Sequence, residues 1–354
     1  MNAARDYRFD LLRVFACLSV LVLHTTSAFL EAPNATLPFF TVAFVNSLSR
    51  AAVPLFVMTA GRFALEKIDD FASITPFLRA RVRRLWIPTL LWSAIYLALF
   101  FADKIFRGSP IDFSLVLYDW FWKGKPGAGY HLWYLYMLIG LELLAPPLFL
   151  WTRKRPRLLN ACNVGIFAAF SAIATALIQR GGTGRGDLFL PFLCVAYLPY
   201  YFLGSQLWSR TRRLDARGRR RLRVLALALV CAGTAIMLAL IYAGRYNDAR
   251  NDFSQQGLFL ALGEYLFFLS LPPSKEGKEP KALGRAAAQS FDVFLSHVAF
   301  LALLTRLFGS WGRVFEETYL GAYALACLTY AFSTATVSVV DYFRRRIAKR
   351  RRAP

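Results

Sequence analysis

Apolar stretches long enough to cross a lipid bilayer recur along the whole chain, and this recurrence restricts the fold more than any other feature. A hydrocarbon core of roughly 30 Å needs about 20 consecutive apolar residues in a helix. Hydrophobic residues make up 57% of the 354 residues and charged residues only 18%. A soluble protein has too little interior to bury so much apolar surface. We therefore expect an all-α, polytopic membrane helix bundle.

We expect about ten membrane spans in a single membrane domain over residues 1–354, with no soluble domain. Pro54 in the second span predicts a kink or break there, and Glu264 interrupts the eighth. The expected spans are residues 11–30, 39–65, 85–102, 131–151, 161–179, 188–208, 224–243, 255–272, 289–308 and 317–340.

The distribution of positive charge predicts the orientation of the chain. With the N-terminus inside, the inside segments carry 31 Lys and Arg residues, with Arg13 at the start of the first span included, and the outside segments carry 9. Cytoplasmic loops of membrane proteins are rich in Lys and Arg. Both termini are therefore expected in the cytoplasm, which requires an even number of spans. The same rule explains the net charge of +22, so we expect membrane lipid and no nucleic acid as a partner.

The five cysteines all lie in apolar segments and form no CxxC pair. This pattern predicts neither a zinc site nor a disulfide framework. We expect no metal and no permanently bound cofactor.

Ionisable residues inside the expected spans are the candidates for chemistry. The three histidines, His24, His131 and His297, lie in or at the edge of spans, and Glu142 lies within the fourth. Such side chains are costly in hydrocarbon unless they are paired or functional. A purely structural role remains an alternative for His131 and His297.

Arg13 and His24 are eleven residues apart in the first span. This spacing places them within about 20° of one helix face and about 16 Å apart along the axis. Arg13 could hold the phosphate end of a long anionic donor whose reactive end lies beside His24. The alternative is an ordinary interfacial arginine.

An arginine cluster follows the second span and consists of Arg79, Arg81, Arg83 and Arg84. The guanidinium group binds phosphate through two parallel hydrogen bonds. The cluster therefore favours a phosphate-binding role. The alternative is a set of topology determinants that face anionic lipid.

Taken in order, these segments resemble the acyltransferase-3 family of integral-membrane O-acyltransferases. Its opening signature, a basic residue, ten residues and a histidine, matches Arg13 and His24, and its RxxR motif matches Arg81 and Arg84. Residues 53–65 resemble its second-span block, although Ala60 stands where the family usually has Ser. Further similar blocks are residues 131–148 and residues 290–297, where Asp292 replaces the usual Gly.

The resemblance implies transfer of an acyl group, commonly acetyl, from cytoplasmic acyl-CoA. The acceptor would be a hydroxyl of a cell-surface glycan or its lipid-linked precursor, as in polysaccharide O-acetylation at a bacterial inner membrane. His24 would be catalytic together with Arg13, as general base or as acyl-carrying nucleophile. The expected substrate- or donor-binding residues are Arg81, Arg84, Arg79, His131, His297 and Glu142.

Two other functions compete with this interpretation. A transporter or flippase of a glycan precursor would also have polar residues within about ten spans. It would not require Arg13, His24 and the RxxR motif together. An acyltransferase that modifies a membrane-embedded lipid or protein is disfavoured only by the order of the blocks.

Overall fold

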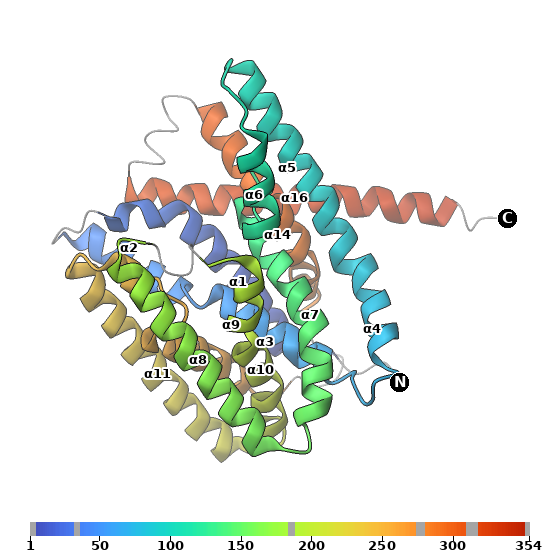
Figure 1. Cartoon of the computed structure of the whole chain (residues 1–354), viewed down its shortest axis with the longest axis vertical. Helices are drawn as coiled ribbons and strands as arrows, with labels where there is room; N and C mark the ends of the chain where they lie inside the picture. The colour runs from blue at the N-terminus through green and yellow to red at the C-terminus, as the bar shows by residue number, and fades with distance from the viewer. Residues whose placement is uncertain (1–4, 32–35, 183–187, 274–279, 309–317, 351–354) are drawn as a thin grey trace. The chain divides into compact units, whose positions relative to one another are not determined.

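The computed structural model describes residues 5–31, 36–182, 188–273, 280–308 and 318–350, and within these ranges it contains helices and no strand (Figure 1). Eight helical segments are long and apolar enough to cross a membrane. The prediction of an all-α, multi-pass membrane protein is thereby confirmed. The eight segments are Tyr7–Glu31, Leu37–Leu65, Ile74–Phe106, Tyr130–Thr152, Pro156–Gln179, Ala216–Tyr242, Lys281–Leu307 and Tyr319–Val340.

The other two predicted spans coincide with shorter helices. The sixth divides at Tyr197 into α9 (Leu190–Ala196) and α10 (Leu198–Thr211). The eighth corresponds to α13 (Gln255–Ser270), which has 16 residues and is only about 24 Å long. If neither crossed the membrane, the eight Lys and Arg residues of segment 209–223 would lie outside, against the positive-inside rule. The charge pattern therefore favours ten crossings.

Reporter fusions test this topology directly. A reporter placed after Leu214 and another at the C-terminus are both expected to behave as cytoplasmic, because arginine-rich segments precede both positions. A fusion after Arg107, in the predicted outside segment, serves as the opposite control. An external reporter after Leu214 would show that α9 and α10 do not cross the bilayer as a pair.

The predicted break in the second span is present, a few residues before the proline. Helix α2 (Leu37–Ser49) ends at Ser49 with Arg50 as its C-cap, and α3 (Ala52–Leu65) starts at Ala52. Pro54 therefore lies in the first turn of α3, where its missing N–H removes no helical hydrogen bond. The proline thus marks the start of the new helix.

The chain divides into two compact units. Along the sequence, one boundary between them lies next to this break and the other lies at Pro272. Unit 1 contains residues 1–52 and 272–354, and unit 2 contains residues 53–271. In unit 1, α1 (Tyr7–Thr26) packs against α2, against α14 (Lys281–Phe308) and against α16 (Tyr319–Arg350). Segments from both ends of the sequence therefore build unit 1.

In unit 2, α11 (Ala216–Tyr242) packs along α13, and α7 (Trp133–Thr152) packs against α9. The remaining helices of unit 2 are α4 (Ile74–Arg81), α5 (Ile87–Phe106), α6 (Phe113–Lys123), α8 (Pro156–Gln179) and α12 (Tyr246–Ala249).

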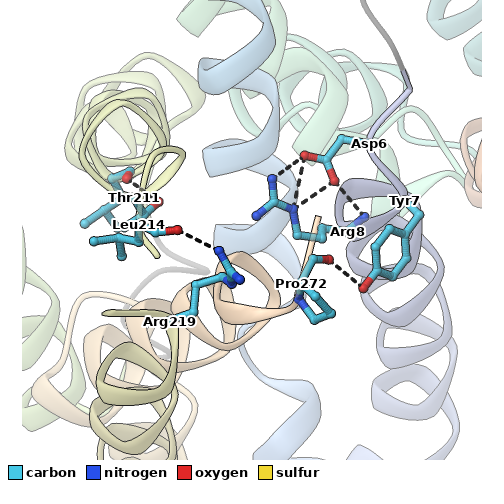
Figure 2. A network of polar contacts seen from close by, with 8 residues as sticks. Asp6, Tyr7, Arg8, Thr211, Leu214, Arg219 and Pro272 are labelled. Atoms are coloured by element: carbon cyan, nitrogen blue, oxygen red, sulfur yellow. Dashed lines mark hydrogen bonds and ion pairs between the residues drawn. The ribbon is translucent and has the colours of Figure 1, made fainter. Parts of the chain in front are cut away.

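The start of α1 is fixed by a local polar network (Figure 2). The Asp6 side chain caps the helix by accepting a hydrogen bond from the Arg8 backbone N–H, and it also pairs with the Arg8 guanidinium at 2.6 Å. The Tyr7 hydroxyl donates to the Pro272 carbonyl at 2.9 Å. An N-cap of this kind is worth about 1 kcal/mol, so the network defines where the first span begins. Figure 2 also shows Arg219, in unit 2, donating to the Leu214 carbonyl.

Helices α3 and α10 approach each other at two glycines. A Cβ atom added at Gly61 would lie 1.9 Å from the Tyr201 carbonyl oxygen, and one at Gly204 would lie 1.9 Å from the Met58 carbonyl oxygen. Small residues allow such backbone contact between helices in membranes. Gly61 belongs to the second-span block. The close approach of the Tyr201 backbone explains why this position has no side chain.

Gly61→Ala should destabilise the protein by about 1–3 kcal/mol, because the added methyl group forces two backbones apart. The thermal unfolding midpoint of the purified protein in detergent reports this loss. Gly165→Ala in α8 is the matched control. Apart from the adjoining backbone of α8 itself, its added Cβ meets no atom of the described residues within 4 Å, and alanine is the better helix former. Equal midpoints for the two variants would contradict the close α3–α10 contact.

Candidate functional site

Two of the three histidines lie against each other in unit 1. The rings of His24, on α1, and His297, on α14, are stacked with their centroids 5.3 Å apart and an interplanar angle of 28°. His297 is fully buried, whereas His24 is partly exposed. Residues 273 positions apart in the sequence are brought together because α1 and α14 pack side by side. His24 is therefore the accessible member of a histidine pair.

The hydrogen bond of His297 defines its tautomer. Its Nδ1 lies 2.7 Å from the carbonyl oxygen of Phe294, one turn earlier on α14. A carbonyl oxygen only accepts hydrogen bonds, so Nδ1 carries the proton and the lone pair of the neutral ring is on Nε2. This bond also holds the ring in the orientation in which it stacks on His24.

Arg13 lies on α1 with His24, at the predicted helical spacing. Its guanidinium is 3.8 Å from the Asp10 carboxylate, and its side chain is 34% exposed. Asp10 is buried and also forms an ion pair with Arg5 at 2.6 Å. The guanidinium of Arg13 is thus close to a carboxylate that it shares with a second arginine, and it keeps access to solvent.

One ion pair of unit 2 joins two of the predicted site residues. Arg81 Nε lies 3.0 Å from Glu142 Oε1, and the Glu142 side chain is fully buried. Arg81 ends α4, and a π-helical turn, Val82–Trp86, connects α4 to α5. Such turns often occur at functional sites. A charge inside a membrane protein requires a partner, and Arg81 supplies one to Glu142.

Arg81 and Arg84 line one pocket of about 340 Å³, which we call the cationic pocket. Its other main lining residues are Lys67, Ser73, Pro76 and Phe77. The side chain of Arg79 is exposed and does not line it. The structure therefore brings together the two arginines of the RxxR motif but not Arg79.

His131 occupies an aromatic environment in unit 2. It lies in a short 3₁₀ turn, Tyr130–Leu132, and is buried. Its ring makes edge-on contacts with Tyr96 and Tyr130, at centroid distances of 5.1 and 5.9 Å. A role in substrate binding stays a prediction for this residue.

From the sequence alone we predicted neither the contact between His24 and His297 nor the ion pair between Arg81 and Glu142. The position of Lys67 in the cationic pocket was also not predicted. The demand of a buried acid for a cation could have suggested the Arg81–Glu142 pair. No local signal indicates that His24 meets His297, because that contact depends on how α1 and α14 pack.

A family model described as an acyltransferase domain, acyltransferase-3, matches residues 6–339, which is nearly the whole chain. The chain belongs to the acyltransferase-3 family. It is a multi-pass membrane acyltransferase, and the Arg13–His24 spacing and the Arg81–Arg84 motif lie within the matched range. No curated protein and no solved structure gave a match. Family membership favours an acyltransferase over the transporter alternative.

Proposed function

We propose that this acyltransferase moves an acyl group, acetyl in the simplest case, from cytoplasmic acyl-CoA to a hydroxyl of a cell-surface glycan or its lipid-linked precursor. The membrane would be the bacterial inner membrane. The observation that carries the proposal is the stacked His24–His297 pair, because a partly exposed imidazole beside a buried one is suited to proton transfer.

In the proposed step, His24 accepts the proton of the acceptor hydroxyl while the oxygen attacks the thioester carbonyl carbon. The new C–O ester bond forms and the C–S bond breaks. The leaving CoA thiolate then takes the proton from the imidazolium, so that His24 returns to its neutral form. His297 is a positioning residue that holds the ring of His24.

An alternative path forms an acyl-imidazole on His24 first and transfers the acyl group in a second step. The two paths differ when acyl-CoA is supplied without acceptor. Only the second path then labels the protein with the acyl group and releases CoA in an amount equal to that of the enzyme.

The donor's phosphates are assigned to arginines. Arg81 and Arg84 line one pocket, and Arg13 remains partly exposed on α1. Guanidinium groups bind phosphate oxygens through paired hydrogen bonds. These observations favour phosphate recognition over a purely lipid-facing role.

Replacing Arg81 and Arg84 together by Lys should weaken CoA binding by about tenfold or more, since Lys keeps the charge but loses the paired hydrogen bonds. Calorimetric titration of the purified protein with CoA measures the effect. Arg157→Lys, at an exposed position on the same predicted side, is the control and should bind CoA normally. An unchanged affinity for CoA in the double variant would indicate that the two arginines are only topology determinants.

The proposed function itself is tested by transfer in reconstituted vesicles. With labelled acetyl-CoA on the side of the termini and a hydroxyl-bearing glycan acceptor on the other side, the label should appear as a base-labile ester on the acceptor. Label that stays on CoA with every glycan acceptor supplied would contradict the proposal.

A further inference from the structure

Helix α6 lies in the predicted outside segment between the third and fourth spans, and it exposes apolar side chains. Seven of its 11 residues are exposed, and they cover an arc of about 200° around the helix axis. We call these seven residues the outer face of α6. One of them is Ser114, whose hydroxyl donates to the Asp112 side chain at 2.5 Å. The other six are Phe113, Leu115, Leu117, Tyr118, Phe121 and Trp122.

The two charged side chains of α6 lie on the opposite side of the helix. Asp119 and Lys123 are half-buried and pair with each other at 3.9 Å. Asp119 also lines a pocket together with Phe100 and Lys104 of α5. A helix on the surface of a soluble protein has the reverse pattern, with its charged residues outward. Water is therefore an unfavourable environment for the outer face.

The helix is firmly attached to the rest of unit 2 through its inner side. The Trp120 Nε1 group donates to the Tyr136 hydroxyl of α7 at 2.7 Å, and this hydroxyl lies 2.8 Å from the Ser93 hydroxyl of α5. The loop after α6 packs closely on α5, since a Cβ added at Gly127 would lie 2.8 Å from the Phe100 Cβ. The packing of α6 thus fixes the helix and leaves its outer face uncovered.

The apolar surface of the third span continues onto this face. The ring of Phe113 lies with its centroid 5.8 Å from that of Phe101 on α5, and Leu91 and Leu99 of α5 are also exposed. Helix α6 is only about 16 Å long and cannot itself cross a hydrocarbon core of roughly 30 Å. Tyrosine and tryptophan are enriched where membrane and water meet. Lipid is the partner that fits an uncharged, aromatic face at this place in the chain.

We propose that α6 is an interfacial helix that lies in the outer leaflet, with Leu117 and Phe121 among the lipid chains. Amphipathic helices bind a membrane surface in this way through the apolar area that they bury. Through the Trp120–Tyr136 hydrogen bond, α6 then fixes the depth of the first turn of α7, next to His131. The inference depends on the predicted topology and not on the identity of the acyl donor or acceptor.

The test measures the lipid exposure of a spin label on Phe121→Cys in lipid nanodiscs. Collisions with O₂, which dissolves in lipid, are compared with collisions with a water-soluble nickel complex. The ratio of the two should be severalfold higher at Phe121 than at Arg107→Cys, an exposed position of the same predicted outside segment. It should resemble the ratio at Leu91→Cys. The background lacks the exposed native cysteines, which are Cys162, Cys231 and Cys327, each replaced by Ala.

A second measurement uses the wild-type protein and therefore does not depend on how the variants fold. Nanodisc lipid with a photoreactive diazirine in its acyl chain should label the tryptic peptide of residues 108–123, which contains α6. The peptide of residues 85–104, from the third span, is the positive control. Lipid label on the control peptide alone would overturn the inference.

Two results of the spin-label experiment would also overturn it. Equal collision ratios at Phe121 and Arg107 would place the outer face in water. Protection of the Phe121 label from both O₂ and the nickel complex would show that protein covers the face. The mass of the complex in the nanodisc would then show whether the covering protein is a second copy of this chain.

Discussion

Replacing His24 by alanine should lower the rate of acyl transfer by roughly 10²-fold or more while leaving membrane insertion intact. The lower limit is what a positioned general base contributes. Imidazole is the side chain whose unperturbed pKa lies near neutrality, so it can accept and return a proton where alanine cannot. Membrane insertion should not suffer, because an apolar residue is less costly in a span than histidine.

His24→Gln separates catalysis from polarity at this position. Glutamine keeps hydrogen-bonding groups but is not a base at neutral pH, so it should be as inactive as His24→Ala. His297→Ala and His131→Ala should also reduce activity, by smaller factors, since neither is proposed to take the proton. A well-inserted His24→Ala protein that transfers acyl groups at nearly the wild-type rate would refute the role of His24.

The second large effect concerns the buried ion pair of unit 2. Arg81→Ala should destabilise the protein by about 3–5 kcal/mol, because it leaves a buried carboxylate without its cation. Glu142 is 0% exposed. Adding Glu142→Gln to this variant should restore most of the lost stability, since the amide is neutral. Chemical unfolding in the same detergent measures the free energy of unfolding of the wild type, of Arg81→Ala and of the double variant.

The reverse single change should cost less. Glu142→Gln leaves an arginine whose side chain is 26% exposed, so the guanidinium can turn towards water. The expected order of stability is therefore wild type, Glu142→Gln, the double variant and Arg81→Ala. Donor binding should not follow this order, because the double variant regains stability without regaining the guanidinium. A double variant no more stable than Arg81→Ala would exclude a significant energetic role for the pair.

The fold was largely predictable because the bilayer imposes one strong rule. Helices satisfy their own backbone hydrogen bonds, and apolar runs therefore mark spans. The positions at which helices end or change their winding were harder to predict from the sequence. The π-helical turn at Val82–Trp86 leaves no distinct signature in a basic run. The interruption at Tyr197 does have one, because Pro199 lies in the first turn of α10, but the apolar run concealed it. The break near Pro54 was predicted because proline has a defined backbone constraint.

The candidate site was predictable only as a set of residues. The cost of polar groups in hydrocarbon singles out His24, His297 and Glu142 from the sequence. Their partners depend on packing between helices far apart in the chain, as in the His24–His297 stack. Lys67 illustrates a further limit, since the positive-inside rule already accounts for a lysine at that position.

The central claim, acyl transfer to a surface glycan that depends on His24, is tested most directly by mass spectrometry of the glycan. Glycan should be compared from cells lacking this acyltransferase and from the same cells supplied with the wild-type protein or His24→Ala. The account predicts that one ester-linked acyl mass is absent in the deletion, returns with the wild-type protein and stays absent with His24→Ala. Identical glycan masses in all strains, or full restoration by His24→Ala, would contradict it.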